Sequence, residues 1–309
     1  MYDNRFDNFA KDLKKGQIQV CVIMQNENII FDYYKNRKAE ANLHPIHSCT
    51  KSIVSMLVGI CLRDGLISDI DTPIIEYLSG YTRYLDDAKQ CIAIRHLLTM
   101  TPGFDWPEFG EWNFGSPMEY SKDIVKFVLE RNLTEEVGTK MNYNSGCSNL
   151  LSYIIQTVSG VKLSEYASAN LFTPLGISDY IWHEKQGISL GANGLKMKVA
   201  DMVKLGCLCL HSGKLNNTVI ILANWMEEST KPRFLTYEGI GSYGYHWWTS
   251  TLKTNKNEEV NYYFAMGLFG QYIIVIPQHQ MVVVFVSENY GDTIKPMSYF
   301  RNNIADILE

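Results

Sequence analysis

The sequence has no long run of apolar residues and no strong excess of charge of either sign. None of its apolar stretches reaches the roughly 20 residues that a membrane-spanning helix needs. The N-terminal segment, MYDNRFDNFAKDLKKG, has no apolar core, so we expect no secretory signal in it. A net charge of −5 gives no reason to expect nucleic acid or an anionic membrane as a partner. We therefore expect a soluble, cytoplasmic protein that binds neither.

A disulfide framework and a metal-binding pattern are also missing. The seven cysteines are an odd number, and several lie inside apolar runs, such as Cys61 in MLVGICL. Free buried cysteines behave as small hydrophobic residues, and this usage favours a reducing compartment. Cys207 and Cys209 have no second pair nearby, and His183-Glu184 lacks the second histidine of a zinc helix. We predict that the protein needs no metal and no cofactor.

Two common enzyme signatures are absent or out of place. There is no Gly-x-Ser-x-Gly elbow, which counts against an α/β-hydrolase. The segment Gly239–Gly244 fits Gly-x-Gly-x-x-Gly, but it neither follows a clear strand nor opens a helix. A dinucleotide-binding domain is therefore not expected.

The order of apolar patterns predicts an α+β protein. With 309 residues and 46% hydrophobic composition, the chain can form two domains, or one domain with a large insertion. Runs typical of strands occur near both ends, at 17–34 and after about 243, while helical segments and loops lie between. We predict an antiparallel sheet built from both termini and flanked by helices, comprising residues 1–65 and 195–309. Residues 66–194 are predicted to form an inserted all-α domain.

A serine followed three residues later by a lysine is the first candidate for chemistry, because the two share one face of a helix. The pattern occurs three times, beginning at Ser48, Ser159 and Ser250. Only Ser48 opens a strongly apolar helix, predicted over 48–64, in which burial would lower the pKa of Lys51 and allow it to act as a base. Taken alone, the motif favours an ordinary helix N-cap at Ser48. His44 and His47 are further possible bases, although no acidic residue that would orient either of them can be identified.

Tyr143 is the second candidate. It lies in MNYNSG, which follows a glycine-containing loop and precedes an apolar helix. A tyrosine on such a loop can project into a cleft, where a nearby lysine ammonium would lower its pKa and let it move protons. The chain has 19 tyrosines, so simple packing of this loop is the alternative.

Together these segments resemble the serine β-lactamase and penicillin-binding-protein family, and in particular its class C β-lactamase-related members. The similarity comprises Ser48-Cys-Thr-Lys51, Tyr143-Asn-Ser145, HLLTMTPGF, LFTPLGI, NGLKMKVAD and YGYHWW, in that order. The resemblance implies a β-lactamase/transpeptidase-like fold. It also implies Ser48 as the nucleophile, with Lys51 and Tyr143 as its proton-handling partners.

The sequence departs from the family pattern in two places. The second motif ends in Ser145 where true β-lactamases have Asn, and the expected Lys-Thr-Gly or His-Thr-Gly of the third motif is missing. We align the third motif with Ala265–Gly267, which would put the backbone N–H of Leu268 in an oxyanion hole beside that of Ser48; an ungapped alignment would move it to Tyr262–Phe264. In either alignment, the motif has no cation to hold a β-lactam carboxylate.

This variant, with Tyr-x-Ser and a Gly-x-x-Gly-Gln strand, looks more like the family's esterases and 6-aminohexanoate-dimer hydrolases. We expect a serine hydrolase that cleaves a small-molecule ester or amide through an acyl-enzyme on Ser48. The alternatives are a β-lactamase or D-alanyl-D-alanine carboxypeptidase, and a non-catalytic or acylated penicillin-recognising receptor. Gly267, Leu268, Ser145 and Gln271 are the remaining candidate residues for oxyanion and substrate binding. Trp182 either walls the cleft or is a partly buried aromatic.

Overall fold

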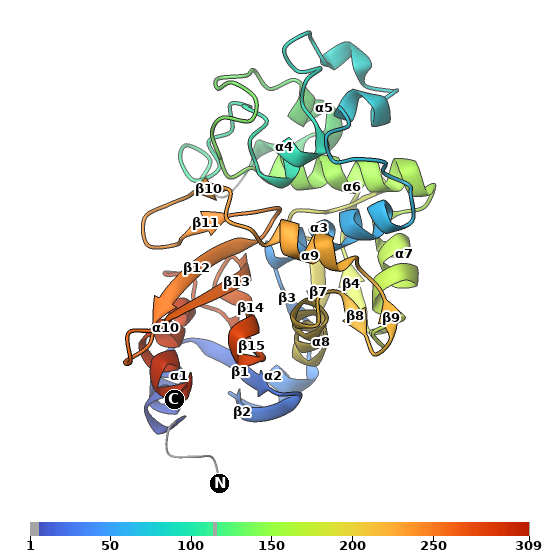
Figure 1. Ribbon diagram of the computed structural model, residues 1–309. Coiled ribbons are helices and arrows are strands. Elements are labelled where there is room, and N and C mark those ends of the chain that lie inside the picture. The colour runs from blue at the N-terminus through green and yellow to red at the C-terminus, as the bar shows by residue number, and fades with distance from the viewer. Residues whose placement is uncertain (1–5, 114–115, 309) are drawn as a thin grey trace.

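The computed structural model describes residues 6–113 and 116–308 of the chain, and Figure 1 shows their path. Strands from both ends of the chain form one antiparallel sheet in the order β10-β11-β12-β13-β14-β15-β1-β2. Its strands are β1 Ile18–Gln25, β2 Asn28–Tyr34, β10 Phe234–Leu235, β11 Ser242–Tyr243, β12 Trp248–Lys253, β13 Glu259–Gly267, β14 Gln271–Ile276 and β15 Met281–Ser287. β1 pairs with β15, and Ile18 lies opposite Ser287, which confirms the predicted sheet from both termini.

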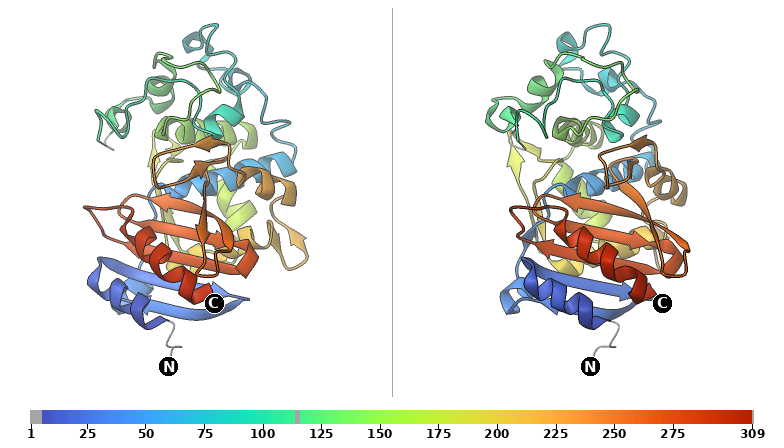
Figure 2. Two further views of the ribbon diagram at one scale, coloured as in Figure 1. Left: turned by 60° about the vertical axis from the view of Figure 1, so that its left-hand side comes forward. Right: turned by 90° about the vertical axis from the view of Figure 1, so that its left-hand side faces the viewer.

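Helices cover both faces of this sheet, which is why its central strands are apolar throughout. The covering helices are α1 Asp7–Lys15, α3 Cys49–Arg63, α8 Val199–Leu210 and α10 Lys295–Leu308. Every residue of β14 and β15 is buried. Val284 of β15 belongs to the core that includes α3 and α8, whereas Phe285, on the opposite face, belongs to the core with α1 and α10. Figure 2 shows α1 and α10 lying together across the outer face.

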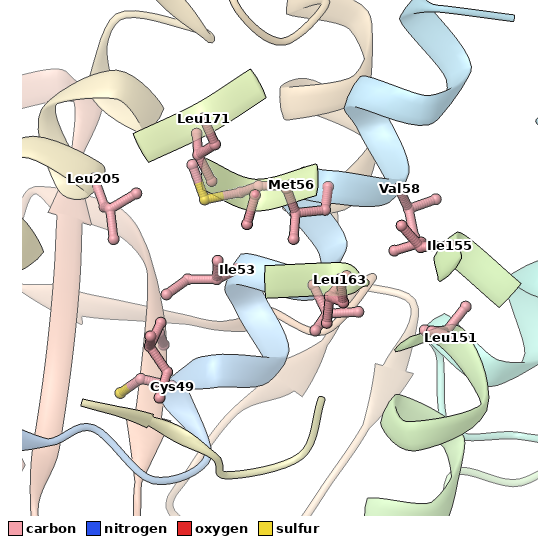
Figure 3. Close-up of a cluster of buried hydrophobic side chains, with 14 of the residues drawn as sticks. Cys49, Ile53, Met56, Val58, Leu151, Ile155, Leu163, Leu171 and Leu205 are labelled. Carbon is pink, nitrogen blue, oxygen red and sulfur yellow. The ribbon is translucent and has the colours of Figure 1, made fainter. Parts of the chain in front are cut away.

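Helix α3 is the buried helix that the sequence predicted. Its residues from Cys49 to Cys61 are all buried, as expected for a helix that is apolar on all sides. Figure 3 shows Ile53 and Met56 of α3 among side chains from α6, α7 and α8. Truncating such a fully buried side chain to alanine typically costs about 2–5 kcal/mol of unfolding free energy. The start of α3 is therefore held in a fixed position between the sheet and the helices behind it.

The segment 66–194 contains both helices and short strands, and its first three α-helices lie above the sheet in Figure 1. Its elements are α4 Ile94–Leu98, α5 Ile124–Leu129, α6 Ser145–Ser159, α7 Leu163–Ala167, β4 Tyr180–Trp182, β5 Glu184–Lys185 and β6 Ile188–Ser189. α6 packs against α3. β4 pairs with β7, Leu195–Met197, which in turn pairs with β3, His44–Pro45. This small sheet joins the segment to the strand that leads into α3, and the division into two domains stays a prediction.

The remaining elements lie around the main sheet. They are α2 Arg37–Ala41, β8 Lys214–Leu215, β9 Thr218–Val219 and α9 Ala223–Ser229. Ser250, which begins the third Ser-x-x-Lys segment, lies within β12, and the turn to β13 begins only after Lys253. Within the described residues, no helix has the length and apolarity needed to cross a membrane.

Candidate active site

Ser48 stands directly before α3, at the N-terminus of this buried helix. The preceding residue, His47, has a φ of +47°, a conformation uncommon for residues other than glycine. The Ser48 hydroxyl makes no capping hydrogen bond to the helix. It instead accepts a hydrogen bond of 3.0 Å from Nζ of Lys51, one turn further along α3. The structure thus decides against an ordinary N-cap and places the hydroxyl beside an amine.

Lys51 is buried with its ammonium facing three oxygen atoms. Nζ donates to Oγ of Ser48 at 3.0 Å, to Oγ of Ser145 at 3.1 Å and to the carbonyl oxygen of Ala192 at 2.9 Å. Burial lowers the pKa of Lys51 to about 8, while the nearby charge of Glu108 acts in the opposite direction. A substantial fraction of Lys51 is therefore neutral in mildly alkaline solution, as a general base requires.

Tyr143 lies against the same ammonium. Its ring centroid is 4.9 Å from Nζ of Lys51, and the ring is stacked between Phe109 at 4.7 Å and Trp248 at 5.8 Å. The expectation that Lys51 lowers the pKa of Tyr143 was wrong. Burial and the charge of Glu108 raise this pKa well above its ordinary value, and a hydrogen bond with Ser48 only partly opposes them. Tyr143 is therefore a neutral phenol, suited to donating a proton.

Ser145, the third residue of the second motif, connects Lys51 to a carboxylate that the sequence did not reveal. Its hydroxyl donates to Oε1 of Glu108 at 2.6 Å, and its backbone N–H donates to Oε2 at the same distance. Trp106 also donates, through Nε1, to Oε2 of Glu108 at 2.8 Å. Glu108 is buried and lies in the loop after the TPG segment. No local pattern marks this residue, because its link to Ser145 exists only in the folded chain.

The end of β13 lies beside the segment that leads into Ser48. A Cβ on Gly267 would lie 2.3 Å from the carbonyl oxygen of Ile46, so this strand runs directly against the segment that leads into Ser48. Gly267 and Leu268 line the same cleft as Ser48. Tyr262 and Phe264, the residues of the other alignment, are buried in the core on the outer face. The structure thus brings the Ala265–Gly267 segment to the site, and not Tyr262–Phe264.

Residues 3–293 of the chain match the family described as Beta-lactamase. The chain belongs to the beta-lactamase family. Its sequence identity to individual members is low, although its fold is closely similar to theirs. It is 22% identical over 309 residues to the 6-aminohexanoate-dimer hydrolase of Paenarthrobacter ureafaciens, with 89% of this chain and 75% of that protein covered.

Solved structures show the same β-lactamase-like fold. A putative 6-aminohexanoate-dimer hydrolase from Bacillus anthracis superposes with a TM-score of 0.80 at 20% identity, covering 97% of this chain and 81% of that one. A class C beta lactamase from Rhodobacter sphaeroides gives 0.77 at 15% identity, covering 99% of this chain and 100% of that one. The predicted β-lactamase-like α+β fold and the family are confirmed. The expectation that 66–194 is all-α was wrong, because this segment also contains the short strands β4, β5 and β6.

Two of the predicted site residues of this beta-lactamase family member lie behind the cleft wall. Gln271 is buried, and its amide donates to the carbonyl oxygens of Ser287 at 2.6 Å and Leu268 at 3.4 Å. Trp182 is also buried, and its Nε1 donates to the carbonyl oxygen of Leu190 at 2.9 Å. Neither residue lines the cleft, whereas Leu268 and Leu190 do. Gln271 and Trp182 therefore support the wall, and Trp182 is a buried aromatic.

The cleft has a volume of about 820 Å³ and is lined mainly by apolar side chains, including Phe109, Met118, Leu190 and Ile240. Two lysines, Lys185 and Lys196, line it although neither belongs to the third motif. Lys185 is anchored to the backbone carbonyl oxygens of Met118 and Glu119.

Lys196 of β7 lines the same cleft and is half-buried. It makes no ion pair with any residue of the described chain. Its charge helps to lower the pKa of His47, the residue next to Ser48. A cation therefore lines the cleft, although none stands in the third motif. In residues 6–113 and 116–308, no cluster of three or more His, Cys, Asp or Glu side chains is arranged to hold a metal ion.

Proposed function

We propose that the protein is a serine hydrolase that cleaves an ester or amide through an acyl-enzyme on Ser48. The observation that carries this proposal is the convergence of three side chains from separate parts of the sequence. Ser48 and Lys51 are joined by a 3.0 Å hydrogen bond, and Tyr143 contacts both of them. A hydroxyl beside a desolvated lysine and a neutral phenol is an arrangement for acyl transfer.

Acylation begins with neutral Lys51. It removes the proton of Ser48 as the hydroxyl oxygen attacks the substrate carbonyl carbon. The resulting oxyanion is stabilised by the backbone N–H groups of Ser48 and Leu268, both of which line the cleft. Tyr143 then donates its proton to the departing alcohol or amine and recovers one from the Lys51 ammonium. This order suits a tyrosine whose pKa is raised, because the phenol keeps its proton until the leaving group needs it.

Deacylation uses the same groups with water as the nucleophile. Once the leaving group has departed, a water molecule takes its place beside Tyr143 and attacks the acyl carbon. Tyr143 accepts the proton of this water as it passes its own to neutral Lys51, so that no free phenolate is needed. The Lys51 ammonium then gives this proton to the Ser48 oxygen as the bond to the acyl carbon breaks, so that Lys51 is neutral again and the enzyme returns to its starting state.

The shape and lining of the cleft indicate an uncharged, apolar group on at least one side of the scissile bond. Most of the lining is apolar, and the aromatic rings of Phe109 and Tyr237 stand at the rim. A second candidate function, β-lactam or D-alanyl-D-alanine hydrolysis, is favoured by one observation. Lys196 faces the cleft without an ion-pair partner in the described chain and can attract a substrate carboxylate.

Hydrolysis of p-nitrophenyl acetate, p-nitrophenyl butyrate and nitrocefin by wild type and Ser48→Ala tests the proposal. The matched controls are Ser159→Ala and Ser250→Ala, because these serines begin the other two Ser-x-x-Lys segments. We expect ester turnover that disappears only in Ser48→Ala, and a fluorophosphonate adduct on Ser48 by mass spectrometry. Rapid nitrocefin turnover would favour the second candidate. Absence of turnover and of labelling at Ser48 would indicate a non-catalytic member of the fold.

A further inference from the structure

The hydrogen bonds around Lys51 have fixed directions. Of its three acceptors, the carbonyl oxygen of Ala192 has no proton to give. The hydroxyl of Ser145 has a single proton, and the 2.6 Å bond to Oε1 of Glu108 uses it. Only the hydroxyl of Ser48 has a proton that is not committed to a stronger acceptor.

These directions matter when Lys51 loses a proton. The neutral amine has two N–H donors and one lone pair. Its donors stay with Ala192 and Ser145, neither of which can donate in return. The lone pair must then face Ser48, the group from which Lys51 has to remove a proton. The direction of the Ser145 hydroxyl therefore decides whether neutral Lys51 is aimed at the nucleophile.

Glu108 is itself rigidly held. Its two oxygens accept from Oγ and the backbone N–H of Ser145 and from Nε1 of Trp106. Trp106 is almost fully buried, and its ring packs edge-on against Trp112 at 4.9 Å and Phe127 at 6.0 Å. Because all these donors point at the carboxylate, it acts only as an acceptor toward Ser145.

We propose that Glu108 is a positioning residue for the reaction: by holding the hydroxyl proton of Ser145, it directs the lone pair of Lys51 toward Ser48, and its charge balances the ammonium formed when Ser48 is deprotonated. This inference rests on the proposed function of Ser48 and Lys51. It also explains why a serine can stand at the third position of the second motif. A hydroxyl can donate or accept, and the buried carboxylate fixes which of the two it does.

The electrostatic surroundings of Lys51 agree with this role. The titratable groups that act on Lys51, or on which it acts, come from α3, α6 and four other segments; they are Cys49, Cys147, Glu108, Tyr143, His47 and His246. Glu108 is the carboxylate in this set, and its charge raises the pKa of Lys51 against the effect of burial. Removing that charge should therefore lower the pKa of Lys51.

Glu108→Gln is the sharpest test because it keeps the shape of the side chain. To keep accepting from Trp106 and the Ser145 backbone, the new amide must turn its NH₂ toward Oγ of Ser145. The serine proton is then free to be donated to the lone pair of Lys51, away from Ser48. We expect kcat/KM for p-nitrophenyl butyrate to fall by about 10- to 100-fold, mainly through a lower kcat. The rising limb of the pH profile of kcat/KM should also move about 1 pH unit lower, because Lys51 has lost the neighbouring negative charge. Glu108→Asp keeps the charge, so its rising limb should stay at the wild-type pH.

Glu111→Gln is the matched control, because it neutralises an exposed carboxylate of the same loop and should leave kcat and the pH profile unchanged. A wild-type profile in Glu108→Gln would overturn the proposal. The proposal would also be overturned if Glu108→Gln and Glu108→Asp lost kcat/KM equally and the rising limb of the pH profile did not move. That result would mean that Glu108 acts only through packing. If Glu108→Gln does not fold by circular dichroism, Ser145→Ala breaks the same connection, and a wild-type profile in that variant would overturn it equally.

A measurement independent of turnover separates this inference from the proposed function. In protein carrying ¹³C-labelled lysine, the Cε signal of Lys51, assigned with Lys51→Met, reports its titration. We expect its midpoint to fall in Glu108→Gln and to stay in place in Glu111→Gln. If wild type neither turns over esters nor labels at Ser48, the proposed function fails, and this titration still decides whether Glu108 balances Lys51. An unmoved midpoint in Glu108→Gln would overturn that pairing.

Discussion

Gly267 and Ile46 approach so closely that a methyl group on the glycine would lie 2.3 Å from the isoleucine carbonyl oxygen. Real Cβ atoms do not come so near to backbone oxygen, so any side chain at this position must move the end of β13 away from the segment that carries Ser48. Because Leu268 follows Gly267 directly, this contact sets the distance between the two N–H groups proposed for the oxyanion hole.

Gly267→Ala should therefore impair catalysis more than folding. We expect kcat/KM to fall by at least about 10-fold, because the donors to the oxyanion lose their alignment. The free energy of unfolding should fall by about 1–3 kcal/mol, as for other overpacked sites. Ester hydrolysis and urea denaturation measure the two effects. Gly80→Ala is the control, since a Cβ there meets no atom within 4 Å. An alanine variant at Gly267 with wild-type kcat/KM would show that this contact does not set the site.

The parts of the structure that depend on local pattern could be predicted from the sequence. The apolar run after Ser48 specifies a buried helix, and burial of its only lysine then follows from the helix period. The strands at both ends are short β-branched and aromatic runs with clear turns between them, so the main sheet could also be predicted. Ser48, Lys51 and Tyr143 were found because each lies beside such a pattern.

The rest depends on contacts between segments far apart in the chain. Glu108 is linked to Ser145 across 37 residues, and nothing in the loop around it distinguishes it from an exposed carboxylate. The pKa of Tyr143 was predicted in the wrong direction because its burial between two aromatic rings and beside Glu108 is a tertiary feature. Gln271 and Trp182 have the residue types of a binding site, but their backbone partners turn them away from the cleft.

The buried lysine should make the stability of the protein depend on pH. Burial lowers the pKa of Lys51 from 10.5 to about 8 in the folded state, so the unfolded chain binds this proton more tightly. Stability should therefore rise as the pH increases from about 8 to 10.5, by up to about 3 kcal/mol. Lys51→Met has no such proton to lose.

Urea denaturation at pH 7 and pH 10 measures this difference. From pH 7 to pH 10, the free energy of unfolding of wild type should increase relative to that of Lys51→Met. A gain that is equal in the two proteins, or larger in the variant, would show that Lys51 is not desolvated in the folded state.

Lys196 should favour substrates that carry a carboxylate. Mono-p-nitrophenyl glutarate and p-nitrophenyl butyrate differ mainly in a terminal carboxylate, and only the former can pair with a cation in the cleft. We expect Lys196→Gln to raise KM for the glutarate ester about 10-fold while leaving KM for the butyrate ester near its wild-type value. Lys198→Gln is the control, because Lys198 pairs with Asp179 and does not line the cleft. Equal effects of Lys196→Gln on both esters would exclude a role in carboxylate binding.

Tyr143→Phe should harm the reaction in proportion to how much the leaving group needs a proton. The phenylalanine ring can keep the stacking with Phe109 and Trp248, so we expect folding to be preserved. p-Nitrophenolate departs without protonation, whereas the alkoxide of an ethyl ester needs a proton from the phenol. The loss in kcat/KM should therefore grow from p-nitrophenyl to phenyl to ethyl butyrate, reaching about 10²- to 10⁴-fold for the ethyl ester. An equal loss for all three esters would mean that Tyr143 acts on Ser48 and not on the leaving group.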